Sequence, residues 1–225
     1  MGEVVIEAIR KGDVEGVARM LDEDPSLVGA RVDGERTLLH VATDWPGHWP
    51  RVGEMIRMLA ARGVELDAAF PGKQHQETAL HWAASSDDVE ALDALLDAGA
   101  WIEAPGSVIG GGSALSDAVA FRNWRCARRL VERGARTTIW QAAALGMLER
   151  VQGFFADGGP EEREVTNAFW AACDGGQQEA AEYLAARGAD VNWVGHDGLR
   201  PVDVARRSGN WELARWLEER GAGAG

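Results

Sequence analysis

The sequence predicts an all-α solenoid in which short helix pairs are stacked side by side. A helix-ending phrase recurs along the chain as "LLDAGA" (95–100), "LVERGA" (130–135) and "YLAARGAD" (183–190). Counting back 18 residues from its glycine reaches His81, Ser116 and Trp170, and an alanine follows two positions after each of them. Self-similarity at a fixed spacing is typical of repeat architectures. With 46% hydrophobic and 26% charged residues, the chain also has the composition of a folded protein.

The clearest copy of the repeat is residues 77–104, "ETALHWAASSDDVEALDALLDAGAWIEA". Its first helix is expected to begin after Thr78, whose hydroxyl can accept from an unpaired amide of the first turn. Its small alanines suit close packing against a neighbouring helix. A second helix follows with an apolar stripe formed by Val89, Leu92, Leu95 and Leu96. Gly99 can adopt the left-handed conformation that ends this helix.

About seven such units account for essentially the whole chain, which we expect to form one domain. The approximate boundaries are residues 1–33, 34–72, 73–106, 107–136, 137–160, 161–195 and 196–225. Each unit buries its apolar face only against its neighbours, so fewer than about three would not be stable alone.

Several of these segments share a recognisable consensus. They are "AIRKGDVEGVARMLDEDPSLV" (8–28), "TLLHVA" (37–42), "TALHWAA" (78–84), "LLDAGA" (95–100) and "RGADVNWVGHDGLRPVDVARRSGN" (187–210). The chain resembles the ankyrin repeat, and specifically a bacterial-type single array. The resemblance implies projecting β-turn loops that line a concave groove together with the first helix of each pair. It also implies a role in binding other proteins.

Departures from the regular pattern indicate where function could lie. His40 and Gly63 are 23 residues apart rather than 18, so five extra residues separate the helices of the second repeat. They belong to "DWPGHWP" (44–50), whose prolines stop the helix and stiffen the loop. The loops at 68–77 and 104–113 are also long, and the glycines in the second favour a tight bend or a mobile tip. The fifth repeat, by contrast, lacks most of its hairpin at 134–146.

Repeats two to four are predicted to gather aromatic and polar side chains in one concave region, which has the general composition of a ligand pocket. The candidate binding residues are Asp44, Trp45, His48, Trp49, Trp82, Ser85, Ser86, Asp87, Asp117, Phe121 and Arg122. His48 has no consensus role, and Asp44 could orient its imidazole while Ser85 or Ser86 supplies a hydroxyl. Asp87 or Asp117 is the candidate acid.

Other conspicuous side chains are expected to be structural. His40 and His81 occupy the consensus Thr-x-x-His position, where the imidazole bonds to loop backbone. We expect packing roles for Trp140, Trp170, Trp211 and Trp216, from among the ten tryptophans of the chain.

The charge and cysteine content restrict the functional class. A formal charge of −13 disfavours nucleic acids and anionic membranes as partners. The basic stripe Arg122, Arg125, Arg128, Arg129, Arg133 and Arg136 is interpreted as a solvated helix face. Cys126 and Cys173 provide neither a disulfide framework nor metal-ligand spacing, so we expect no metal, no cofactor and a cytoplasmic location. No apolar run is long enough to span a bilayer.

Two functional hypotheses follow. The leading one is a recognition module that grips a protein segment in the groove of repeats two to four, through exposed tryptophans and a polar rim. The alternative is an aromatic-walled small-molecule site roofed by the insertion at 45–50, either for binding alone or for metal-free acid–base catalysis around His48, Asp44 and Asp117. An enclosed cavity favours the alternative, whereas a shallow trough favours the protein partner.

Overall fold

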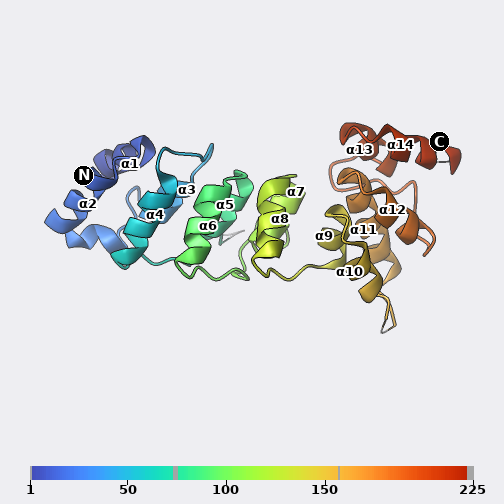
Figure 1. The fold of residues 1–225 in the computed structure, drawn as a ribbon, viewed down its shortest axis with the longest axis horizontal. Coiled ribbons are helices and arrows are strands. Elements are labelled where there is room, and N and C mark those ends of the chain that lie inside the picture. The colour runs from blue at the N-terminus through green and yellow to red at the C-terminus, as the bar shows by residue number, and fades with distance from the viewer. Residues whose placement is uncertain (1, 73–75, 157, 222–225) are drawn as a thin grey trace. The chain divides into compact units, whose positions relative to one another are not determined.

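The computed structural model describes residues 2–72, 76–156 and 158–221. Within this part of the chain every regular element is a helix, which confirms the all-α prediction. The helices follow one another in pairs: α1 (Gly2–Lys11) and α2 (Val14–Glu23), α3 (Leu38–Thr43) and α4 (Val52–Ala61), α5 (Ala79–Ser85) and α6 (Val89–Asp97), α7 (Ala114–Ala120) and α8 (Trp124–Glu132), α9 (Ile139–Ala144) and α10 (Leu148–Gly153), α11 (Glu162–Asp174) and α12 (Gln178–Ala185), α13 (Pro201–Arg207) and α14 (Trp211–Glu219) (Figure 1). A short 3-10 helix, η1 (Pro25–Gly29), follows α2.

Contacts between Cα atoms divide the chain into two compact units, residues 1–136 and residues 137–225. In the first unit, α1, α3, α5 and α7 contact one another in sequence, and α2, α4, α6 and α8 form a second row. In the second unit α11 lies between α9 and α13, and α10 contacts α12. Each unit is therefore two helical layers thick. The boundary falls within residues 134–146, where the sequence indicates that the fifth repeat lacks most of its hairpin. That the chain forms one domain of seven repeats stays a prediction.

The α5–α6 pair shows why the sequence folds this way. The backbone N–H of Thr78 donates to Nδ1 of His81 over 3.1 Å, which fixes the first turn of α5. Asp88 caps α6 by accepting from the N–H of Ala91 over 3.0 Å. Leu92 and Leu95 of the predicted apolar stripe are buried on α6, together with Ala91 and Ala94, whereas Val89 and Leu96 are half-buried. Gly99 has a φ of +100°, a conformation that residues with a Cβ rarely adopt, and it follows the end of the helix.

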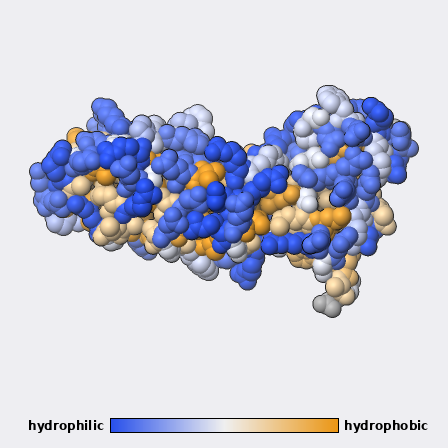
Figure 2. All heavy atoms as spheres, viewed as in Figure 1, coloured by the Kyte–Doolittle hydropathy of each residue, from blue (hydrophilic) through white to orange (hydrophobic). Residues whose placement is uncertain are grey.

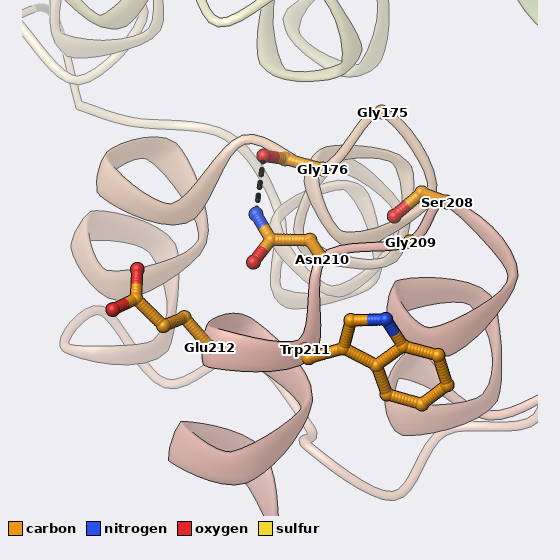
Figure 3. Close-up of a pocket in the computed structure, with 7 residues that line it drawn as sticks. All are labelled: Gly175, Gly176, Ser208, Gly209, Asn210, Trp211 and Glu212. Carbon is orange, nitrogen blue, oxygen red and sulfur yellow. Dashed lines mark hydrogen bonds between the residues drawn. The ribbon is translucent and has the colours of Figure 1, made fainter.

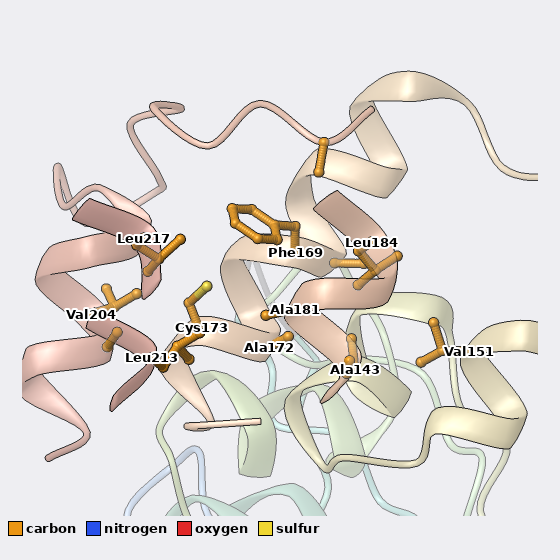
Figure 4. Close-up of a cluster of buried hydrophobic side chains, with 14 of the residues drawn as sticks. Ala143, Val151, Phe169, Ala172, Cys173, Ala181, Leu184, Val204, Leu213 and Leu217 are labelled. Carbon is orange, nitrogen blue, oxygen red and sulfur yellow. The ribbon is translucent and has the colours of Figure 1, made fainter. Parts of the chain in front are cut away.

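The core of the second unit is a continuous apolar cluster (Figure 4). Phe169 and Cys173 of α11 are fully buried and lie between the side chains of the neighbouring helices. Leu184 of α12 and Leu217 of α14 pack into the same cluster from two sides. Ala172, which belongs to the alanine column of the repeat, and Ala181 of α12 are small residues that suit close packing of these helices.

Three loops were expected to depart from the repeat. Residues 44–51 separate α3 from α4, whereas only residues 86–88 separate α5 from α6, so the predicted insertion is confirmed. The long loop 104–113 closes into a tight turn, in which the N–H of Ser107 donates to the oxygen of Gly112 over 3.0 Å. The loop at 68–77 lies partly outside the described residues.

Candidate interaction surface

The insertion between α3 and α4 is held by the helix pair that follows it. The backbone N–H of His48 donates to Asp88 Oδ2 over 2.6 Å, and His48 Nε2 donates to the backbone oxygen of Ser86 over 3.1 Å. Within the loop, the N–H of Gly47 donates to the oxygen of Asp44 over 2.8 Å. Asp88 is itself buried as the cap of α6. The tip of the insertion is thus bonded to a rigid helix terminus.

The insertion is also attached to the preceding helix pair. Asp44 accepts from Arg10 Nη2 over 3.0 Å and from Arg36. Arg51 reaches Glu15 of α2 with two hydrogen bonds of 2.9 and 2.8 Å. The guanidinium carbon of Arg10 lies 5.6 Å from the centroid of a Trp49 ring, within cation–π range. We call residues 44–51 the anchored loop, because polar contacts fix it on both sides.

These contacts replace the catalytic arrangement considered from the sequence. Asp44 pairs with two arginines, and the carboxylate nearest to His48 is Asp88, whose Oδ1 lies 3.8 Å from Nδ1. His48 bonds to the backbone of Ser86 rather than to its hydroxyl, and the buried hydroxyl of Ser85 has no partner. Asp44 therefore does not orient His48. No Ser–His–Asp chain of hydrogen bonds is formed among these described residues.

Two further candidates belong to the packing between repeats. The ring of Trp82 is half-buried and meets the rings of His40 and Phe70 at centroid distances of 4.9 and 5.5 Å. Asp117 is 0% exposed and accepts from the hydroxyl of Ser107 over 2.6 Å, while its Oδ2 has no partner. Asp117 thus lies beneath the loop 104–113 rather than in an open groove.

The environment of Asp117 is unusual for a carboxylate. Burial raises the pKa of Asp117 to about 7, and the nearby Glu77 acts in the same direction. The hydrogen bond from Ser107 opposes this shift in pKa because it favours the ionised form. Sequence reasoning missed Ser107 and Glu77, since a buried serine or glutamate in a long loop carries no pattern that distinguishes it from an exposed one.

Two large apolar side chains of the predicted site remain open to solvent. Trp45 in the anchored loop is 79% exposed, and Phe121 at the end of α7 is 48% exposed. Hydrophilic residues dominate the face seen in Figure 2. The structure gathers Asp44, Trp45, His48, Trp49 and Ser86 in and against one loop.

The predicted structural residues follow expectation with one exception. Nδ1 of His40 lies 2.8 Å from the Thr37 hydroxyl and its Nε2 donates to the oxygen of Glu77 over 3.1 Å. His81 is equally buried, and burial lowers its pKa to about 4. Trp140, Trp170 and Trp216 pack against the second core as predicted. Trp211 is 65% exposed, so its predicted packing role is wrong.

The basic stripe on α8 is neutralised in part by the preceding helix pair. The Arg133 guanidinium lies 2.9 Å from Asp93 and 2.8 Å from Asp97, and Arg136 Nε lies 3.6 Å from Glu103. These contacts agree with a solvated helix face. In the described ranges no cluster of histidine, cysteine and carboxylate side chains has the geometry to hold a metal ion. None of the described helices has the length and apolarity needed to traverse a bilayer.

Comparison with known proteins identifies the fold. A model of the ankyrin repeat matches residues 75–104. The ankyrin repeat domain of Bcl-3, a unique member of the IkappaB protein family, superposes with a TM-score of 0.56 at 23% identity, covering 94% of this chain and 97% of that one. The human ASB11 ankyrin repeat domain gives a TM-score of 0.56 at 16% identity, with 95% and 96% covered. The chain folds as an ankyrin-repeat domain. No curated protein matches it.

Two turns of this ankyrin-repeat domain use residues other than the consensus glycine. Asp87 and Arg122 follow their first helices with φ values of +51° and +59°. Aspartate is among the residues that adopt a positive φ more readily than most. The Oδ1 of Asp87 also accepts from the backbone N–H of Cys126 over 2.8 Å. The side chain of Asp87 thereby links two helix pairs and is not free to bind a ligand through this oxygen.

Proposed function

We propose that this chain is a protein-binding module and that a partner docks on the surface formed by the anchored loop and the ends of α5 and α7. Ankyrin-repeat domains generally serve as protein-interaction modules, which supplies the functional class. The observation that carries the location is Trp45, which is 79% exposed in a loop that is bonded on both sides.

The physical reason is that binding through a loop whose backbone is already ordered costs little conformational entropy. Tryptophan is among the residues that dominate the energy of protein interfaces. Because the loop is already fixed by Asp88, Arg10 and Glu15, the partner does not have to order it. Phe121 adds a second exposed ring in the same unit.

A random dodecapeptide library displayed on phage provides the test. Peptides selected on the full chain are expected to lose at least about tenfold in affinity for Trp45→Ala, the loss typical of an interface hot spot. Trp101→Ala is the matched control, since Trp101 is 56% exposed and follows the opposite end of α6. Selected peptides that bind both variants equally well would refute the location.

A specific observation also supports the alternative of a small-molecule site beside Trp49. The buried indole nitrogen of Trp49 and the buried hydroxyl of Ser85 have no hydrogen-bond partner, and neither does Nε of Arg10. A ligand carrying an acceptor group would satisfy such donors. Ligand-observed NMR with a fragment library tests this second candidate: hits must be lost in Trp49→Phe, which keeps the aromatic bulk and removes the N–H.

A further inference from the structure

The loop at 104–113 in the first unit covers a buried carboxyl group, and we call this segment the glycine loop after its consecutive glycines at 110–112. The hydroxyl of Ser107, a residue only 1% exposed, donates to Asp117 Oδ1 over 2.6 Å. The oxygen of this hydroxyl also accepts from the backbone N–H of Ile109 over 2.9 Å. Ser107 therefore connects the turn of the glycine loop to α7.

Hydrogen bonds from two neighbouring segments also reach the glycine loop. The N–H of Gln76 donates to the oxygen of Gly106 over 3.1 Å, and Nε2 of His81 donates to the oxygen of Gly112 over 3.3 Å. The tip of the loop is not packed, since Val108 and Ile109 are exposed. Segments with few buried apolar contacts open locally at a low cost in free energy. The glycine loop can therefore open while α7 stays folded.

Asp117 is the group beneath the glycine loop that responds to pH. Its Oδ2 is buried without a hydrogen-bond partner, and the buried Glu77 opposes a second negative charge. The titratable neighbours in the adjoining helices stay neutral near pH 7, because burial lowers the pKa of His81 in α5 to about 4 and raises the pKa of the Cys126 thiol in α8. The arginines of α8 lie on its solvated face, and the glycine loop itself contains no ionisable side chain.

We propose that the glycine loop is a pH-controlled latch, which stays closed while Asp117 is protonated and opens when Asp117 ionises. Opening brings water to a carboxylate whose second oxygen has no donor in the closed loop. Ser107 and the backbone N–H groups of Val108 and Ile109 favour the ionised form in the closed loop. Burial outweighs them and raises the pKa of Asp117 to about 7, so the latch responds in the neutral range.

Amide hydrogen exchange of the 15N-labelled full chain, followed by NMR, measures the opening. The reporters are the N–H groups of Ser107 and Gly111, which donate to the oxygens of Gly112 and Ser107 over 3.0 Å each. In the open loop Asp117 should titrate at its ordinary pKa of 3.8. Linkage should then lower the protection factors of both reporters by up to about 70-fold between pH 5 and pH 7.5.

Two sets of amides in the same sample serve as controls. The turn drawn in Figure 3 is held by a side chain that does not ionise, since the Asn210 amide donates to the oxygen of Gly176 over 2.9 Å. The N–H of Gly209 in this turn donates to the oxygen of Arg206 over 3.0 Å, and its protection factor should not follow the titration of Asp117. The N–H of Leu92 in α6 reports unfolding of the whole first unit and should be better protected than the glycine loop at every pH.

Asp117→Asn connects the opening to the carboxyl. The variant keeps the oxygen that accepts from Ser107 but does not ionise, so its glycine loop should be as well protected at pH 7.5 as at pH 5. Should this variant fail to fold, Glu77→Gln gives the second test: loss of the neighbouring charge lowers the pKa of Asp117, so the fall in protection should begin at a lower pH.

Four results would overturn the proposal. They are loop protection that changes less than about threefold from pH 5 to pH 7.5, loop protection equal to that of Leu92, a parallel change at Gly209, and an undiminished pH dependence in the Asp117→Asn variant. The second of these would mean that the glycine loop opens only when the first unit unfolds.

Discussion

The substitution Asp117→Asn should raise the unfolding free energy of the first unit near neutral pH. This gain should shrink as the pH falls. Burial raises the pKa of Asp117 from 3.8 to about 7, so the native state holds a proton that the unfolded chain releases. The stabilisation that this proton provides is fully present below pH 3.8 and is lost as the pH rises to about 7. At about 1.4 kcal/mol for each pH unit, the loss approaches about 4 kcal/mol.

Asparagine keeps the oxygen that accepts from Ser107 but does not ionise. The difference in unfolding free energy between the variant and the parent should therefore grow by up to about 4 kcal/mol between pH 4 and pH 7.5. Urea unfolding followed by far-UV circular dichroism at several pH values measures this difference. Groups other than Asp117 titrate in both proteins and cancel in the comparison.

Ser107→Ala provides the matched control. Removing its hydroxyl deletes a hydrogen bond that favours the ionised carboxyl, so the pKa of Asp117 should rise further. A 13C NMR titration of the Asp117 carboxyl in both proteins reports this pKa directly. A free-energy difference between Asp117→Asn and the parent that stays constant from pH 4 to pH 7.5 would refute the reasoning.

Three further outcomes are expected. Arg122→Gly should raise the unfolding free energy by about 1 kcal/mol, measured by urea titration, because glycine adopts a φ of +59° without strain; a loss of stability would contradict this. Gly175→Ala should lower the melting temperature, because the new Cβ would lie 2.0 Å from a backbone oxygen. Gly153→Ala is the control and should raise the melting temperature slightly, because its Cβ would have open space around it. Cys126 and Cys173 should react with a thiol reagent only on unfolding, because burial raises the pKa of both thiols; fast labelling of the native protein would contradict the structure.

The regular part of the fold could be read from the sequence because it depends on local rules. Glycine at the end of a helix, alanine at a close helix contact and leucine every three or four residues each have one dominant physical role. The α5–α6 pair therefore lies where the sequence places it. The buried roles of His40 and His81 were predictable for the same reason, since the consensus position fixes their surroundings.

The candidate site was only partly predictable, because its contacts join residues from different repeats. The sequence predicts that His48 and Asp44 lie in one region, but it does not specify which charged side chain each of them contacts. In the anchored loop His48 contacts Asp88, while Arg10 and Arg36 both bind Asp44. Likewise, Trp211 begins α14 outside the buried face formed by Leu213, Ala214 and Leu217, and its size alone favoured packing over exposure.

The anchored loop has a consequence for how the first unit unfolds. In a linear array each helix pair interacts only with its neighbours, so terminal pairs separate from the rest at little cost. Here one loop bonds Arg51 to Glu15 of the first pair and His48 to Asp88 of the third. Loss of the contacts with the first pair would weaken the hold of the loop on the third pair, and the reverse also applies. We therefore expect the first three pairs to lose hydrogen-exchange protection together, so that fraying from the N-terminus is replaced by one cooperative opening.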